Sequence, residues 1–149
     1  MMRILVDADA CPDKNIIIEL ANKYHIELHF FTDINHDLSG YDAKVHIVDQ
    51  GRDSVDFAII GAMKQGDLIV TADYGVASLA LGRNGLVISP SGKQLHHDNI
   101  DQLMFERHLG QKSRQAGLRG PRHKKRSSKD SQKFFHQLEE LIRVHQIHS

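Results

Sequence analysis

The stretch ILVDADACP at residues 4–12 runs from an apolar segment directly into two aspartates and a proline. Ile4 to Val6 are typical of a strand that is buried on both faces, and the proline suits the first turn of a helix. A second stretch, LIVTADYG at residues 68–75, has the same design, because its apolar segment leads into Asp73. Two buried strands that end in acids predict an α/β domain with a mainly parallel sheet.

The rest of the chain alternates between short apolar runs and segments of helical period. Strands buried on both faces are expected at residues 4–6, 28–31, 45–48, 68–70 and 86–88. Stripes of apolar residues at helical spacing occur at residues 16–24, 55–63, 76–81 and 100–104. The predicted fold class is therefore α/β, a three-layer α/β/α arrangement around a mainly parallel central sheet.

The length of 149 residues suits a single domain. Residues from about 110 to 129 show little periodicity and contain several glycines, which predicts a loop or arm. A C-terminal helix is expected at about 131–147, packed on the body through its apolar face. A single cysteine, a start unlike a signal peptide and the lack of any long apolar run favour a cytoplasmic protein that does not enter the membrane. The oligomeric state stays open.

The charges are separated along the chain, although the formal net charge is zero. Residues 1–106 hold 8 basic and 16 acidic residues, whereas residues 107–129 hold 9 basic residues and no acid. This asymmetry predicts a cation as partner for the body and an anion, RNA or another phosphate-bearing ligand, for the basic segment. A solvated connector is the alternative. The candidate phosphate contacts are Arg107, Lys112, Arg114, Arg119, Arg122, Lys124, Lys125 and Arg126.

Acids follow the predicted strands at the edge where ligands bind in parallel α/β sheets. If the chain stays extended after the first strand, Asp7 and Asp9 point to the same side. Asp53 and Asp56 are three residues apart at the start of a helix and share a face. Asp53 is either the helix cap or a ligand, with the cap favoured, whereas Asp56 can point toward the same edge as Asp73.

Carboxylates that converge at one edge repel one another unless a cation lies between them. Hard oxygen ligands select Mg²⁺ or Mn²⁺, and such a cluster is typical of phosphodiester hydrolysis. The candidate catalytic residues are Asp7, Asp56 and Asp73, and Asp9 and Asp53 complete the candidate metal ligands. Thr71 and Asn99 are candidates for supporting roles behind them, Asn99 alternatively as a helix cap.

Four segments together resemble the YaiI/YqxD family of bacterial proteins: MRILVDADACP, QGRDSVDFAII, GDLIVTADYGVASLAL and NIDQLMFERHLGQKSRQAGLRGPR. The resemblance covers essentially the whole chain. That family is similar to PIN-like domains, whose acidic quartet binds divalent metal in many ribonucleases. The resemblance implies a PIN-like fold with a first acid at Asp7, a helix-start acid at Asp56 or Asp53 and a third at Asp73, Asp9 being additional. The stretch HKKRSSK at residues 123–129 is more basic than that family's pattern.

Three functions compete at this point. The first is a metal-dependent nuclease, acting on RNA, and the second is a non-catalytic RNA-binding module of the same fold. The third is a phosphatase with an Asp-x-Asp motif, which ranks lowest because Cys11 stands where that motif has Thr or Val. The chain has 6 Phe, 3 Tyr and no Trp, and most Phe fall in core stripes, so stacking platforms for single strands are not expected.

Overall fold

The computed structural model describes residues 2–33, 38, 40–49, 51, 53–115, 117 and 125–146, without the side chains of residues 114 and 115. Its strands are β1 (Arg3–Asp7), β2 (Glu27–Asp33), β3 (Lys44–Val48), β4 (Leu68–Val70), β5 (Leu86–Ile88) and β6 (Gln94–Leu95). Its helices are the 3-10 helix η1 (Ala8–Ala10) and the α-helices α1 (Lys14–Lys23), α2 (Ser54–Ala62), α3 (Tyr74–Gly82), α4 (Ile100–Gln115) and α5 (Ser128–Gln146).

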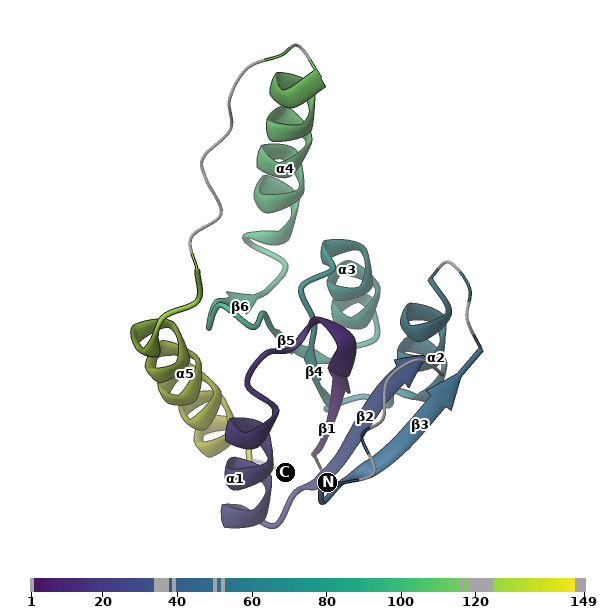
Figure 1. Cartoon of the computed structure of the whole chain (residues 1–149), viewed down its shortest axis with the longest axis vertical. Helices are drawn as coiled ribbons and strands as arrows, with labels where there is room; N and C mark the ends of the chain where they lie inside the picture. The colour runs from purple at the N-terminus through teal and green to yellow at the C-terminus, as the bar shows by residue number, and fades with distance from the viewer. Residues whose placement is uncertain are drawn as a thin grey trace.

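The strands form one sheet in the order β3-β2-β1-β4-β5-β6. Neighbours from β3 to β5 are parallel, and only β6 runs antiparallel, to β5. Helices α1 and α5 cover one face, while α2, α3 and the first turns of α4 cover the other (Figure 1). The predicted three-layer α/β/α fold with a mainly parallel sheet is thus confirmed.

Alternation along β1 explains why both faces of the sheet are covered. Ile4 and Val6 lie in the core under α1 and α5, whereas Leu5 lies in the core under α2 and α3. All three side chains are fully buried. The C-terminal helix packs as expected, since Phe134 and Leu138 of α5 are also fully buried.

Three sequence predictions about the elements need correction. Strand β3 is not buried on both faces, because it lies at the edge of the sheet and leaves Ile47 63% exposed. The short strand β6 was not expected, since two residues carry no readable period. Helix α4 continues to Gln115, so the predicted loop from about residue 110 begins as helix, and α5 starts already at Ser128.

The direction in which the chain crosses the sheet changes between β1 and β4. From β1 the chain passes through α1 to β2 on one side, and from β4 it passes through α3 to β5 on the other. Such a switch point leaves a crevice at the carboxyl ends of the two central strands, where ligands bind in open α/β sheets. Among the helices that the structure describes, none has the length and apolar character to cross a membrane.

Candidate active site

Three aspartates from different parts of the chain lie around this switch point, near enough for the charges of two of them to act on the third. Asp7 is the last residue of β1, Asp73 follows β4, and Asp56 lies in the first turn of α2. Burial raises the pKa of Asp7 to about 6, and the negative charges of Asp56, Asp9 and Asp73 add to the rise, against a smaller lowering by the backbone of Ala10. The site therefore holds more negative charge than it can stabilise alone.

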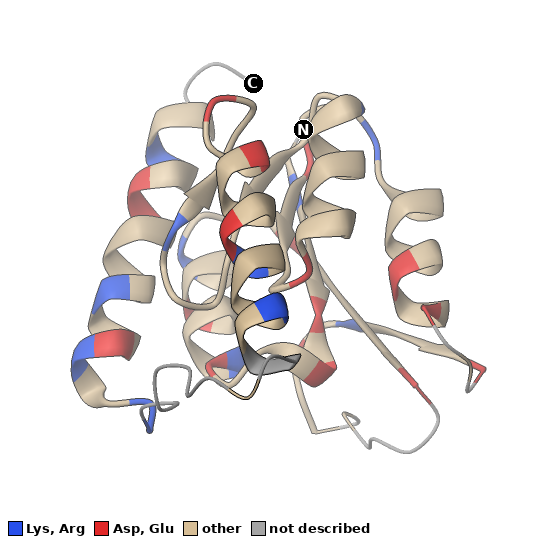
Figure 2. Cartoon of the chain, turned by 90° about the horizontal axis from the view of Figure 1, so that it is seen from above, with Lys and Arg blue, Asp and Glu red and all other residues tan. Residues whose placement is uncertain are grey.

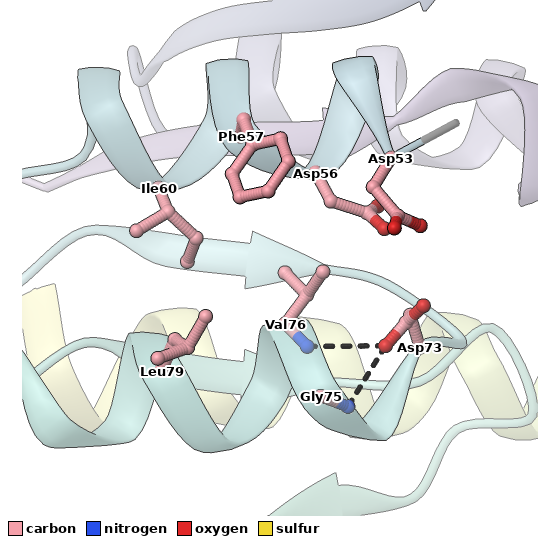
Figure 3. A pocket seen from close by; sticks show the side chains of 8 residues that line it. All are labelled: Asp53, Asp56, Phe57, Ile60, Asp73, Gly75, Val76 and Leu79. Carbon is pink, nitrogen blue, oxygen red and sulfur yellow. Dashed lines mark hydrogen bonds between the residues drawn. The ribbon is translucent and has the colours of Figure 1, made fainter. Parts of the chain in front are cut away.

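The pKa of Asp56 is also raised. Burial is the largest cause, followed by the negative charges of Asp73 and Asp53 and by a hydrogen bond with the side chain of Asp53. Two carboxyl groups that share a hydrogen bond need a proton between them, or a cation in its place. The pair lies at the end of α2 that faces Asp73 (Figure 3).

Asp73 is held rigidly at the start of α3. One of its oxygens, Oδ1, accepts hydrogen bonds from the backbone N–H groups of Gly75 at 2.8 Å and Val76 at 3.1 Å (Figure 3). Its own N–H donates to Oγ1 of buried Thr71 at 3.1 Å. The N–H of Thr71 in turn donates to the carbonyl of Ile88 at 3.2 Å, so Thr71 ties the Asp73 turn to the sheet.

Asp53 stands at the N-cap position of α2 but does not cap it. Its φ of 64° places it in the left-handed region, and its side chain makes no capping hydrogen bond. A capping residue normally has extended backbone, which directs its side chain to the first free N–H groups of the helix. The predicted cap is therefore wrong, and the side chain of Asp53 bonds Asp56 instead.

Asp9 does not share the side of Asp7 through strand alternation, as an extended chain would require. The backbone turns into η1 at Ala8, directly after β1. The carboxylate of Asp9 then accepts hydrogen bonds from Oγ1 of Thr32 at 2.6 Å and from the N–H of Asp33 at 3.3 Å. Asp9 is thus anchored to β2, and it acts on Asp7 through its charge.

Asn99, predicted as a supporting or capping residue, stabilises the loop before α4. Its Oδ1 accepts from the N–H of His96 at 3.0 Å, and its Nδ2 donates to the carbonyl of Gln94 at 3.0 Å. The amide side chain thus bonds residues that precede the helix and not the first N–H groups of α4. It fixes the position at which α4 leaves the body.

Among the predicted phosphate contacts, Arg107 lies beside the residue that follows Asp73. Its guanidinium is 5.9 Å from the ring centroid of Tyr74, the residue after Asp73, and the two line a shallow cavity with Ala72. Lys112 and Lys125 are exposed. The Arg114 side chain and residues Arg119, Arg122 and Lys124 lie outside the part that the structure describes. Acidic residues occur on helices and loops around the body (Figure 2).

Arg126 is engaged within the fold and not presented as a free phosphate contact. Its Nε donates to Oδ2 of Asp13 at 2.8 Å, its Nη2 bonds the same oxygen, and Oγ of Ser131 donates to Oδ1 at 3.2 Å. These bonds tie the start of α5 to the start of α1. This pairing was not predicted from the sequence because Arg126 and Asp13 are 113 residues apart.

This pair gives a test of the assignment. Arg126→Ala is expected to lower the free energy of unfolding by about 1.5–3 kcal/mol, since a half-buried carboxylate loses a charged partner. Urea denaturation measures the change, and Lys125→Ala, at the exposed neighbour, should stay within about 0.5 kcal/mol of wild type. The Arg126→Ala/Asp13→Ala double variant should lose little more than either single variant. Fully additive losses contradict a coupled pair.

The acids at the switch point have an apolar lining beside them that was not predicted from the sequence. A cavity of ≈ 260 Å³ lies between α2 and α3. Its lining consists of Asp53, Asp56, Phe57, Ile60, Asp73, Gly75, Val76 and Leu79 (Figure 3). The side chain of Phe57 is 71% exposed, so it is an exception to the expectation that most Phe fall in core stripes. The sequence did hold a signal for this lining. Phe57 and Ile60 lie outside the apolar stripe to which the buried residues Ile59 and Met63 belong.

The donor atoms at the switch point are carboxylate oxygens, which suit Mg²⁺ or Mn²⁺. In the described ranges, no three His, Cys, Asp or Glu side chains stand close enough together to bind one ion directly. Mg²⁺ commonly takes only one or two protein carboxylates and keeps several waters, so this spacing fits such an ion. It does not fit an ion such as structural zinc, which needs four protein ligands.

Fold and site together define an α/β protein with a group of acids at the switch point of a mainly parallel sheet. The family described as "Uncharacterized BCR, YaiI/YqxD family" matches residues 5–144, and the chain belongs to this family. The UPF0178 protein of Clostridium novyi is 45% identical over 141 residues, 95% of both chains. That of Ruminiclostridium cellulolyticum is 47% identical over 133 residues, 89% of this chain and 87% of its own. No solved structure matches significantly.

Proposed function

We propose that the protein is a Mg²⁺- or Mn²⁺-dependent nuclease that acts on RNA. The observation that carries this proposal is the placement of Asp7, Asp56 and Asp73 around the switch point, where burial and then the negative charges of the neighbouring acids raise the pKa of Asp7 to about 6. A protein keeps such repulsion where a cation offsets it in the functional state. The PIN-like resemblance, in which acids at these positions bind metal, supports the same assignment.

The chain's own residues divide the work. Asp7, Asp56 and Asp73 would hold the ion, one or two of them directly and the rest through its bound waters. The ion supplies Lewis-acid activation of water and stabilises charge at the phosphate. Two backbone N–H donors position the Asp73 carboxylate, and Thr32 of β2 holds the Asp9 carboxylate by a hydrogen bond. Arg107, stacked near Tyr74, is placed to contact a neighbouring phosphate.

Different observations bear on the two alternative functions, a phosphatase and a non-catalytic RNA-binding module. A phosphatase of the Asp-x-Asp type needs the second acid free beside the nucleophile, but Thr32 and Asp33 anchor Asp9 to β2. A non-catalytic RNA-binding module is favoured by one finding, that no three metal-binding side chains of the described residues converge. We prefer the nuclease proposal because an RNA-binding role alone does not account for half-buried acids that raise one another's pKa at the switch point.

The test is cleavage of a pool of unstructured RNA by the purified full-length chain. We expect cleavage with Mn²⁺ and none with EDTA, and salt-sensitive binding in both conditions. Asp73→Asn keeps the oxygen that caps α3 and removes the charge, so it should fold normally and lose cleavage. Binding that ignores Mn²⁺, with no cleavage of RNA in any divalent metal, would assign the protein to the non-catalytic alternative.

Metal affinity should depend on pH through Asp7. Because the pKa of Asp7 is raised to about 6, Mn²⁺ must displace a proton below that pH and meets an ionised carboxylate above it. We expect the Mn²⁺ affinity to fall about tenfold per pH unit below pH 6 and to level off above pH 7. Titration calorimetry at pH 5.0, 6.0 and 7.5 measures it. A flat profile would remove Asp7 from the ligand set.

A further inference from the structure

The cavity between α2 and α3 has one acidic end and an apolar remainder. Its acidic end is formed by Asp53, Asp56 and Asp73, and its apolar walls by Phe57, Ile60, Val76 and Leu79. Figure 3 shows the apolar side chains of both helices directed into the space between them, beside the carboxylates. The apolar walls are thus continuous with the candidate active site.

Two of these walls are open to solvent. Phe57 is 71% exposed and Leu79 is 57% exposed, one on each helix. Large apolar side chains that gather at the surface and border polar groups mark binding sites more often than chance. Phe57 also directly follows Asp56 in the sequence, so its ring stands beside the acids at a position set by α2.

The two helices that form the groove are linked by a hydrogen bond outside its lining side chains. Nη1 of Arg83, which follows α3, donates to the carbonyl of Ile60 on α2 at 3.0 Å and so links the two helices. At the acidic end, Gly75 leaves room for the Asp73 carboxylate, because a Cβ there would stand 3.1 Å from Oδ1 of Asp73. The spacing of α2 and α3 is therefore set before a ligand binds, which lowers the entropy lost on binding.

Size and charge select the occupant. A volume of ≈ 260 Å³ is below the roughly 300–1,000 Å³ of pockets that enclose a whole drug-sized ligand, so one planar group fits and the rest of its molecule lies outside. The carboxylates repel a phosphate from the groove but tolerate a neutral base. Helix α3 packs against both α2 and α4. The positively charged Arg107 belongs to α4 and so lies on the side of α3 away from the groove.

This layout matches a nucleic-acid strand whose base and phosphates lie on different sides of the acids. An aromatic face beside a charged backbone path is how proteins bind unpaired bases. We propose that the groove is a nucleobase subsite in which one unpaired base stacks on Phe57, so the substrate strand is single-stranded at the acids. The inference rests on the proposed function, because the acids are the reason to place nucleic acid here.

The experiment uses the full-length protein and a 12-nucleotide uridine RNA that carries one 2-aminopurine. Binding is measured with EDTA present, so that no cleavage occurs. We expect the 2-aminopurine fluorescence to be quenched on binding, because the base stacks on an aromatic ring. Phe57→Ala should remove the quenching and weaken binding roughly 5- to 100-fold, while Phe57→Tyr should retain both. A fully paired RNA duplex should bind more weakly than the single strand.

Val144→Ala is the matched control, since Val144 is an exposed apolar residue on α5, across the sheet from the groove. It should leave quenching and affinity unchanged. Phe57-dependent quenching without cleavage in any metal supports the subsite and overturns the nuclease. If Phe57→Ala changes neither quenching nor affinity while cleavage still requires Asp7, the subsite is overturned and the nuclease proposal stands. A dimer in sedimentation that Phe57→Ala converts to monomer assigns the groove to a second copy and also overturns it.

Discussion

Asp7→Asn is expected to abolish metal-dependent RNA cleavage, on the order of 10³-fold, and at the same time to stabilise the metal-free protein. The two effects have one cause. The carboxylate that would hold the ion is half-buried, and this burial, with the negative charges of Asp56, Asp9 and Asp73 adding to it, raises its pKa to about 6. Removing its charge removes both the ligand and the repulsion. Catalytic sites commonly show this exchange between stability and activity.

The sign of the stability effect follows from the pKa. In the unfolded chain Asp7 ionises near pH 4, whereas in the folded protein it holds its proton until about pH 6. The folded state therefore binds more protons between these values, and the stability of the wild type falls as the pH rises through this window. Asn has no such dependence. After allowance for partial exposure, Asp7→Asn should gain about 1–2 kcal/mol at pH 7.5 in EDTA.

Urea denaturation in EDTA at pH 4.5 and 7.5 measures this difference, which should grow with pH and then stay constant above pH 7. Adding Mn²⁺ should stabilise the wild type and leave Asp7→Asn unchanged, since ligand binding stabilises only a state that binds. A variant that is less stable than the wild type at pH 7.5 without metal would contradict the repulsion. Undiminished cleavage by Asp7→Asn would contradict the proposed role of Asp7.

The same substitution at Asp67 should have the opposite effect on stability. Asp67 is 1% exposed and accepts hydrogen bonds from Nε of Arg3 at 3.2 Å and from the N–H of Lys64 at 2.8 Å. Nη2 of Arg3 bonds its second oxygen and also donates to the carbonyl of Ala62. Asp67→Asn leaves a largely buried guanidinium without its counter-charge. We expect a loss of about 3–5 kcal/mol in the free energy of unfolding.

Thermal unfolding checks this result, with a fall in Tm of roughly 6–20 °C for a domain of this size. Glu139→Gln is the control, because its partner Lys23 is exposed and such pairs contribute less than about 1 kcal/mol. Cleavage by Asp67→Asn, measured well below its Tm, should match the wild type, since Asp67 precedes β4 at the other end of the strand from Asp73. A Tm within 2 °C of the wild type would show that the Arg3–Asp67 pair contributes little.

The fold was readable from the sequence where its signals are local. The predicted strands at 68–70 and 86–88 coincide with β4 and β5, because unbroken apolar runs between polar turns leave few alternatives. The placement of Asp7 and Asp73 at strand ends followed from the same runs. The 3-10 turn that moves Asp9 was not readable, since residues 8–10 carry neither a helical nor a strand period.

At the site, the same division holds. Asp53 was expected to cap α2 from its residue type and position, which is the local rule. Its left-handed backbone and its bond to Asp56 depend on how the chain enters α2 from the preceding residues. Arg126 was grouped with the basic segment by its neighbours in sequence, while its carboxylate partner comes from the far end of the chain.

The sequence by itself determined that this protein is a parallel α/β domain with acids at the carboxyl ends of its strands. Periodicity and strand-end composition are local properties, and parallel pairing brings strand ends to one edge whatever the side chains do. Only the tertiary structure decided that the charges of Asp56 and Asp73 act on Asp7 and that Phe57 stands exposed beside Asp56 (Figure 3). Exposure and charge coupling depend on the distance between α2 and α3, and the packing of both helices on the sheet sets that distance.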